Sequence, residues 1–455
     1  MAPFGPVLAP HGQNIHPSQF PEKSTGVLTT ALTAAAATPS LPFADYSAAL
    51  AAEAQAPGAR HRLAMAEIAR LNAYESEIRA FVSYRTDFQV AVEQCSHPLA
   101  GALVGVKDII LTRDFPTRYG SPFAENEGPR RDAWCVARLG KLGAHVVGKT
   151  VATEFAFSRP GATQNPHDRR RTPGGSSSGS AAAVAAGFVS FALGSQTGGS
   201  IIRPASYCGI VGFKPTFGLL PLDGVHPSST TLDHLGVFTR SPRDAWLLVA
   251  SLLDVAAISI EPTKPRRLLH LQVPEAIPVS ADYNRQLAVF SASCRSAGIV
   301  VDTVEMPVPT EDFIHLQELL CYWEASRILL SIDSPRLTPE LTALLKPFRS
   351  MGLPDYAAAR MKRQAYQQLF GELLQDADAL VLPSATDVAP EGLSHTGDAA
   401  LNRFWTSLHL PVASIPLWTG HQGLPIGLQI VGGMGRDREL LACGEWLFRN
   451  MREEV

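Results

Sequence analysis

The sequence predicts an α/β protein, a single large domain in which helices cover both faces of a central β-sheet. Segments with the apolar spacing of helices alternate with short apolar runs typical of buried strands, a pattern that favours a mostly parallel sheet. The chain has 455 residues, of which 45% are hydrophobic, and this is enough for a large core. No internal repeat and no low-complexity linker divides it.

The first predicted elements follow an N-terminal arm. We expect residues 1–44 to be partly irregular, because their first half is rich in Pro and Gly. From Asp45 onward, apolar residues recur at three- and four-residue spacing, which predicts helices. The next expected elements are a strand at Ile78–Arg85, a strand at Leu103–Leu111, a helix at Asp132–Gly143 and a strand at Ala144–Thr150.

The second half of the chain contains a long helical excursion. Ser241 and Pro242 are typical of a helix cap and first turn, so a helix is expected there. Residues of about 310–375 are largely helical, and three apolar strand segments follow them. Those late strands would leave open edges if they stood alone, so we expect them to rejoin the early sheet. Residues 45–455 are therefore predicted to form one domain.

Charge and cysteine content exclude several functional classes. The net charge is -3 and no long basic run is present, so neither nucleic acid nor a membrane surface is an expected partner. The six cysteines form no Cys-x-x-Cys pair and no cluster with histidine, which excludes zinc and redox-dithiol motifs. A reducing, cytoplasmic location is expected. No apolar run is long enough to span a membrane, and Lys23–Ser40 fits a helix or arm better than a signal peptide.

The stretch TPGGSSSGSAAAVAAG, Thr172–Gly187, places three serines between glycine pairs and then begins a helix. Gly175–Gly179 matches the G-x-S-x-G elbow of serine hydrolases, with Ser177 at its centre. That motif needs a strand directly before the serine. The preceding residues are polar and contain two prolines, so the elbow interpretation is disfavoured.

A second motif suggests nucleotide binding. Gly143–Thr150 matches G-x-x-x-x-G-K-[ST] letter for letter. A phosphate-binding loop must lie between a strand and a following helix, whereas here a predicted helix precedes the match. Val146 and Val147 also favour a strand, so Lys149 is expected at a strand end rather than on a phosphate.

A third interpretation joins three separate places in the chain. Lys107 lies in an apolar strand, where burial would lower its pKa and free a neutral amine to act as a base. Ser200 ends a glycine turn whose backbone N–H groups can point at one oxygen, so a nucleophile would lie beside its own oxyanion hole. A serine of the Gly174 turn could relay a proton between Lys107 and Ser200.

These residues resemble the amidase signature family. The segments that carry the resemblance are GVKD at 105–108, the serine–glycine stretch at 172–187 and GSQTGGSIIRPASYCGIVGFKPTFG at 194–218, and the likeness extends over roughly residues 45–450. The resemblance implies a mixed central sheet between helical layers, with no cofactor and no metal. It also implies a Ser–cis-Ser–Lys triad made of Lys107, Ser176 and Ser200.

The resemblance assigns further roles around this triad. The oxyanion hole is implied to be the backbone amides of Thr197, Gly198, Gly199 and Ser200. Ser177 and Ser178 are implied to support the turn through hydrogen bonds. We expect a cis peptide bond between Gly175 and Ser176, which would direct the Ser176 hydroxyl toward the other two members of the triad.

Two positions depart from the family pattern. The family commonly has Thr-Asp before the TGGS turn, where this chain has Ser195-Gln196, so a supporting carboxylate is missing. The arginine after the nucleophile often stands two positions on, whereas Arg203 stands three positions on. Arg203 is therefore a candidate substrate contact, with a structural role as the alternative.

The predicted function is hydrolysis of amide bonds in a small molecule through an acyl-enzyme, with esters, carbamates and aryl amides as further candidate substrates. Tyr119, Phe155, Tyr322 and Trp323 could favour aryl groups or belong to the core. Two alternatives stay open: the amidase subunit of a glutamine-dependent amidotransferase, and a nucleotide-binding protein that uses Gly143–Thr150. A homodimer is compatible with all of this.

Overall fold

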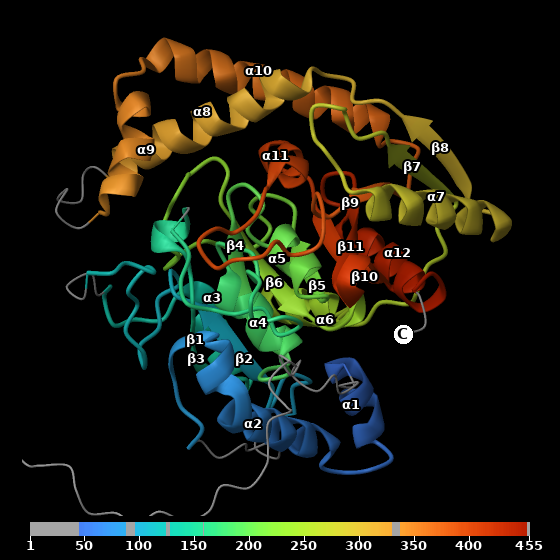
Figure 1. The fold of residues 1–455 in the computed structure, drawn as a ribbon. Coiled ribbons are helices and arrows are strands. Elements are labelled where there is room, and N and C mark those ends of the chain that lie inside the picture. Colours follow the sequence, from blue (N-terminus) through green and yellow to red (C-terminus); the bar gives the residue numbers. More distant parts are fainter. Residues whose placement is uncertain (1–44, 88–95, 124–127, 158, 330–336, 453–455) are drawn as a thin grey trace, which may run out of the picture. The chain divides into compact units, whose positions relative to one another are not determined.

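The strands join into one mixed sheet (Figure 1). The computed structural model describes residues 45–87, 96–123, 128–157, 159–329 and 337–452, so the predicted arm, residues 1–44, lies outside the described residues. In the described ranges the sheet has 11 strands in the spatial order β1-β3-β2-β4-β6-β5-β10-β11-β9-β7-β8. Their bounds are β1 Phe81–Tyr84, β2 Leu103–Lys107, β3 His145–Thr150, β4 Phe191–Gln196, β5 Val211–Lys214, β6 His234–Thr239, β7 Arg267–Leu271, β8 Val300–Val304, β9 Ala379–Pro383, β10 Val412–Thr419 and β11 Pro425–Val431.

Strand directions correct one expectation. Parallel pairs occur in two separate groups, β3-β2-β4 and β9-β7-β8. The strands between these groups, and the edge strand β1, pair antiparallel. The prediction of a mostly parallel sheet is therefore wrong. Short connections such as the one between β10 and β11 let neighbouring strands pair antiparallel without a crossover helix. The mixed sheet implied by the family resemblance is confirmed, and the late strands do rejoin the early sheet through β10 and β5.

Helices cover both faces of this sheet, as predicted. One hydrophobic cluster joins the sheet to α1, α3, α6, α7 and α12, and a second joins it to α2, α4, α5, α8, α10 and α11. The alternation along β4 shows the two faces, since Phe191 and Leu193 belong to the first cluster and Ala192 to the second. The bounds of the helices are α1 Tyr46–Glu53, α2 Ala59–Ile78, α3 Trp134–Lys141, α4 Ser178–Ala185, α5 Ile202–Tyr207, α6 Pro242–Leu253, α7 Ala281–Ser296, α8 Thr310–Leu329, α9 Pro339–Arg349, α10 Leu353–Leu373, α11 Ala400–Ser407 and α12 Asp437–Asn450.

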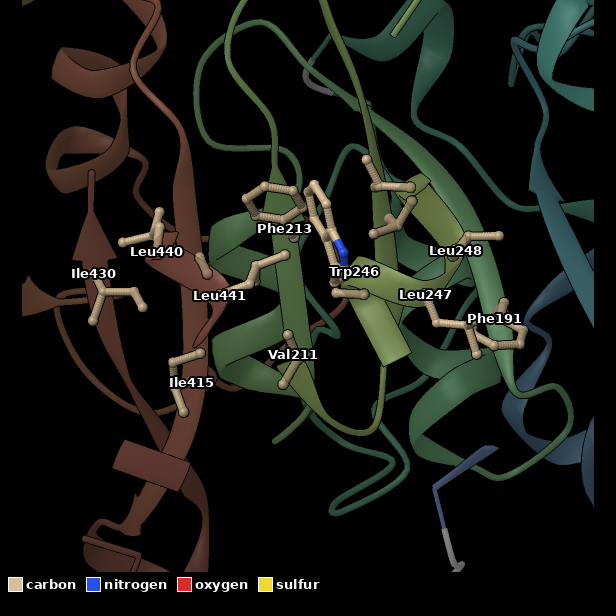
Figure 2. Close-up of a cluster of buried hydrophobic side chains, with 14 of the residues drawn as sticks. Phe191, Val211, Phe213, Trp246, Leu247, Leu248, Ile415, Ile430, Leu440 and Leu441 are labelled. Carbon is tan, nitrogen blue, oxygen red and sulfur yellow. The ribbon is translucent and has the colours of Figure 1, made fainter. Parts of the chain in front are cut away.

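Figure 2 shows part of the first cluster, in which side chains from β4, β5, β10 and β11 meet those of α6 and α12. Trp246 of α6 packs among them with 6% of its surface exposed, beside Phe213 of β5. The predicted cap of α6 is confirmed, because the Ser241 hydroxyl accepts a hydrogen bond from the Asp244 amide at 3.2 Å. The packing of α6 and α12 on these strands holds the centre of the sheet in place, and with it the strand ends that carry the candidate site.

The predicted helical excursion is the layer of α8, α9 and α10, which lie together in Figure 1 beside α11. A small separate core joins α8 to α9 through Leu329, Leu341 and Leu345. None of the helices in the described part of the chain combines the length and apolar character needed to cross a membrane. The five cysteines in these ranges are buried and unpaired, as expected, and Cys95 lies outside the described residues.

Candidate active site

The candidate site begins at the end of β2. Strand pairing stops at Lys107, where the Ile109 and Ile110 amides both bond back to its carbonyl and turn the chain. The strand predicted to reach Leu111 is therefore shorter. The Lys107 side chain is fully buried, and its Nζ donates to Ser176 Oγ at 2.7 Å and to Ser195 Oγ at 2.8 Å. Two candidate residues from different segments thus lie in direct contact.

The serine–glycine stretch is a turn that leads into α4. The peptide bond between Gly175 and Ser176 is cis, as predicted. Ser177 Oγ lies against the backbone of Ser195, donating to its carbonyl at 3.2 Å, and Ser178 Oγ donates to the Gly174 carbonyl at 2.7 Å. Both side chains therefore bond to backbone and hold this turn together, while the Ser176 hydroxyl faces Lys107.

Ser200 lies in the second glycine turn, between β4 and α5. Residues 197–201 connect these elements, and Ser200 lines a cavity of about 220 Å³. The amides of Gly198, Gly199 and Ser200 have no acceptor among the described residues, which is what an oxyanion-binding turn requires. Ser200 Oγ makes no hydrogen bond to Ser176 or Lys107 within those residues, so the structure joins only two of the three predicted triad members directly.

Gln196 takes the place of the expected carboxylate. Its Oε1 accepts from the amides of Ile201 at 2.7 Å and Ile202 at 3.1 Å, and its Nε2 donates to Thr406 Oγ1 at 2.9 Å. A neutral amide therefore bonds the amide groups at the start of α5, with no buried negative charge. Ser195 contributes separately, by accepting from Lys107.

Asp233 and α8 hold the glycine turn from the other side. Thr197 Oγ1 donates to Asp233 Oδ1 at 2.6 Å, and Gln317 Nε2 of α8 donates to the Thr197 carbonyl at 3.1 Å. Asp233 also accepts the amides of Ser228 at 2.7 Å and Ser229 at 2.9 Å. Asp233 thereby links the glycine turn to the loop of residues 228–231, and Gln317 links it to α8.

Glu324 of α8 accepts hydrogen bonds from the same loop. Its carboxylate accepts from the Ser229, Thr230, Thr231 and Tyr356 hydroxyls and from the Thr231 amide, at 2.6–3.2 Å. Burial alone would raise the pKa of Glu324, but hydrogen bonds from Thr231, Tyr356 and Ser229 outweigh it and lower the pKa. This carboxylate links α8 and α10 to the loop that lines the cavity.

Burial shifts the pKa of two ionisable groups that are hydrogen-bonded to candidate site residues, Lys107 and Asp233. It lowers the pKa of Lys107 from 10.5 to about 7, against the opposing charge of Asp233. Burial likewise raises the pKa of Asp233 to about 6, although hydrogen bonds from Thr197, Ser229 and Ser228 partly offset this. A lysine with such a pKa can hold and release a proton near neutral pH.

Arg203 of α5 lines the cavity with 6% of its surface exposed. Its Nη2 donates to the Gly175 carbonyl at 2.7 Å and to Thr396 Oγ1 at 3.2 Å. Among the described residues its buried Nε has no hydrogen-bond partner, and no carboxylate there forms an ion pair with Arg203. Nearby Arg403, in contrast, is ion-paired with Glu318. Arg203 therefore has a structural contact and also unused donors.

The cavity lining both confirms and corrects the sequence analysis. Of the four aromatic residues named from the sequence, Tyr322 lines the cavity, together with Phe157 and Gln317. Tyr119 and Phe155 instead stack on each other, with ring centroids 5.6 Å apart. Trp323 stacks on Tyr356. Sequence reasoning missed the loop that follows β9 and the start of α11, which supply Thr396, Gly397, Asp398, Ala399 and Arg403 to the lining.

The elbow motif and the phosphate-loop motif lack the geometry that their chemistry needs. His145–Thr150 is strand β3, no helix follows it directly, and Lys149 is fully buried with Nζ donating to the Ile110 carbonyl at 2.6 Å. No strand stands directly before Ser177. Within the described ranges, no group of His, Cys, Asp and Glu side chains could hold a metal ion.

Known proteins resemble this chain over most of its length. The family model Amidase matches residues 70–441. A glutamyl-tRNA(Gln) amidotransferase subunit from Exiguobacterium sp. is 33% identical over 425 residues, an alignment that covers 80% of this chain and 88% of that protein. A solved amidase has a TM-score of 0.79 and 27% identity, covering 90% of this chain and 100% of its own. The peptide amidase PAM, solved with the competitive inhibitor chymostatin, has a TM-score of 0.75 and 27% identity, covering 90% of this chain and 98% of its own.

Proposed function

Because the chain belongs to the amidase family, we propose that it hydrolyses amide bonds through an acyl-enzyme on Ser200. The observation that carries the proposal is the 2.7 Å hydrogen bond between buried Lys107 and Ser176, beside a glycine turn with free amides that ends at Ser200. A buried lysine with a pKa of about 7 is half neutral at neutral pH, so it can accept a proton.

The proposed reaction has two halves. In acylation, Ser200 Oγ attacks the substrate carbonyl carbon, and its proton passes to Ser176 as the Ser176 proton passes to neutral Lys107. The amides of the glycine turn stabilise the oxyanion. The proton then returns along the same path to the leaving amine, and the C–N bond breaks. In deacylation, water attacks the carbonyl carbon of the acyl-enzyme ester and its proton passes through Ser176 to Lys107; the proton then returns to Ser200 Oγ as the ester C–O bond breaks and the carboxylic acid leaves. Because the relay protonates the leaving group, it serves amides as well as esters and carbamates.

We assign Arg203 a second role as a contact for a substrate oxygen. Its bond to the Gly175 carbonyl supports the turn. Its Nε has no partner and it has no counter-ion within the part of the chain that the structure describes, which leaves donors for a carboxylate or carbonyl in the cavity. A buried guanidinium without a carboxylate partner is costly, and a substrate anion would offset that cost.

Covalent labelling tests the nucleophile. We expect a fluorophosphonate probe to form an adduct that mass spectrometry locates on Ser200, and the Ser200→Ala variant to remain unlabelled. Ser177→Ala is the matched control and should still be labelled at Ser200. An adduct on Ser177 in the wild type would overturn the assignment and restore the elbow interpretation.

A second candidate function has one observation in its favour. The 33% identity to a glutamyl-tRNA(Gln) amidotransferase subunit supports a chain that releases ammonia from glutamine within a complex with protein partners. Purification of the chain as a stable homo-oligomer that hydrolyses amides without other proteins would contradict it. Co-purification of other proteins that are needed for activity would favour it.

A further inference from the structure

The cavity beside Ser200 is lined by both polar and apolar groups. Its charged and hydroxyl-bearing groups include Arg203, Arg403, Asp398 and Thr396. Phe157, Tyr322 and Leu344 also line it, together with Ala156 and Cys321. These last five residues carry no charge, so the cavity offers an apolar wall as well as polar contacts.

The apolar wall is built from two distant segments and is firmly backed. Phe157 follows β3, whereas Tyr322 belongs to α8 and Leu344 to α9. The ring centroids of Phe157 and Tyr322 are 6.2 Å apart, and all three side chains pack on the core that joins α8 to α9. Each of the three is only partly buried, so each keeps a face free toward the cavity.

No ionised group of the wall competes with an apolar ligand. Burial raises the pKa of Tyr322 to about 12, so its phenol stays neutral over the pH range of any assay. Arg403 and Glu318, whose charges act on Tyr322, are paired with each other. Burying hydrocarbon against such a surface is favourable in proportion to the area removed from water.

We propose that Phe157, Tyr322 and Leu344 form a subsite for an alkyl or aryl group on the acyl side of the substrate, and that Leu344 limits the length of this group. The inference rests on the proposed function. The acyl side is chosen because Ser200 and its turn line the cavity, whereas Lys107 and Ser176, which return the proton to the amine, do not. The acyl substituent therefore extends into the cavity while the amine faces the relay.

A series of primary amides tests the subsite, because all of them release ammonia and differ only in the acyl group. Acetamide, propionamide, butyramide, hexanamide and 3-phenylpropionamide are suitable. In the wild type we expect kcat/KM to rise about three- to fourfold for each added methylene until the wall is covered, as about 0.8 kcal/mol per buried CH2 implies. Leu344→Ala should move the optimum to longer acyl groups, and Leu344→Phe to shorter ones.

Leu345→Ala is the matched control. Leu345 is the next residue of α9 and is fully buried in the core between α8 and α9, away from the cavity lining. Its truncation should lower stability without moving the preferred acyl length. An unchanged optimum in both Leu344 variants, an equal shift in Leu345→Ala, or a length dependence confined to the amine part of N-alkyl amides would overturn the subsite.

Equilibrium binding separates the subsite from the proposed function. Calorimetry with the Ser200→Ala protein would measure the affinity for acetate, hexanoate and 3-phenylpropionate. Affinity that rises with acyl length and changes with Leu344 supports the subsite even if the wild type hydrolyses no amide, a result that would reject only the proposed function. Amide hydrolysis with no dependence on acyl length would reject the subsite and leave the proposed function in place.

Discussion

Replacing Lys107 with methionine is the sharpest test of the chemistry. Methionine fills a similar volume but cannot accept a proton. The nitrogen that donates to Ser176 and Ser195 would be lost, while the packing around β2 would largely remain. Since a positioned general base contributes about 10²- to 10⁴-fold to a rate, we expect kcat/KM for amides to fall by about that factor.

The lowered pKa of Lys107 also sets the size of an effect on the free energy of unfolding. Lys107→Met should raise this free energy although it lowers activity. One pKa unit corresponds to about 1.4 kcal/mol, so lowering the pKa of Lys107 from 10.5 to about 7 makes its protonation in the fold about 5 kcal/mol harder than in water. Between these two values the unfolded chain binds more protons, so stability rises with pH there. Below pH 7 the folded protein bears the full penalty, and Lys107→Met should be the more stable protein.

The assay is a pH profile of kcat/KM together with urea unfolding at pH 6 and pH 9. In the wild type, activity should rise with pH through an apparent pKa of about 7, because only the neutral amine is active. Lys214→Met is the matched control: burial also lowers the pKa of Lys214 to about 7, but its Nζ donates to the carbonyls of Pro215 and Leu410, away from the site. A flat profile from pH 5.5 to 9, or loss of the rising limb in Lys214→Met, would refute the role of Lys107.

Two further changes test the cavity and its support. In Arg203→Ala, kcat/KM for a half-amide of a dicarboxylic acid should fall roughly 30-fold or more beyond the fall for a neutral amide, as a lost charged contact of about 2 kcal/mol implies; equal losses would end the substrate-contact assignment. Glu324→Gln should lower the free energy of unfolding at pH 7 by about 1–3 kcal/mol. Because the pKa of Glu324 is lowered in the fold, this difference should shrink as the pH falls through that pKa, and an unchanged difference at pH 3 would contradict it.

Much of the fold follows from local patterns. Helix α6 begins where Ser241 and Pro242 predict it, because a cap and a proline act through neighbouring backbone groups. The order of the strands in the sheet does not follow from local patterns. The pairing of β10 with β5 joins residues about 200 positions apart, and the choice between parallel and antiparallel neighbours depends on how the whole sheet buries both faces.

In the candidate site, too, some features follow from local sequence and others depend on the fold. Lys107, Ser176 and Ser200 could be named from motifs, because turns and glycine-rich segments are local in sequence, and their catalytic roles stay predictions. Apolar surroundings alone could not separate Lys107 from Lys149 and Lys214, since all three lie in strands, and it was the GVKD motif that singled out Lys107. Only the fold decides that Lys107 faces Ser176 while the other two bond backbone carbonyls.

The sequence by itself determined the family, the α/β class and the three segments that carry Lys107, Ser176 and Ser200. The tertiary structure decided the rest: the hydrogen bond from Lys107 to Ser176, the bonds that Gln196 accepts from the amides of Ile201 and Ile202, and the set of residues that line the cavity beside Ser200. The physical reason is that burial, charge and cavity shape depend on atoms brought together from distant parts of the chain, whereas caps and turns depend on neighbours along it.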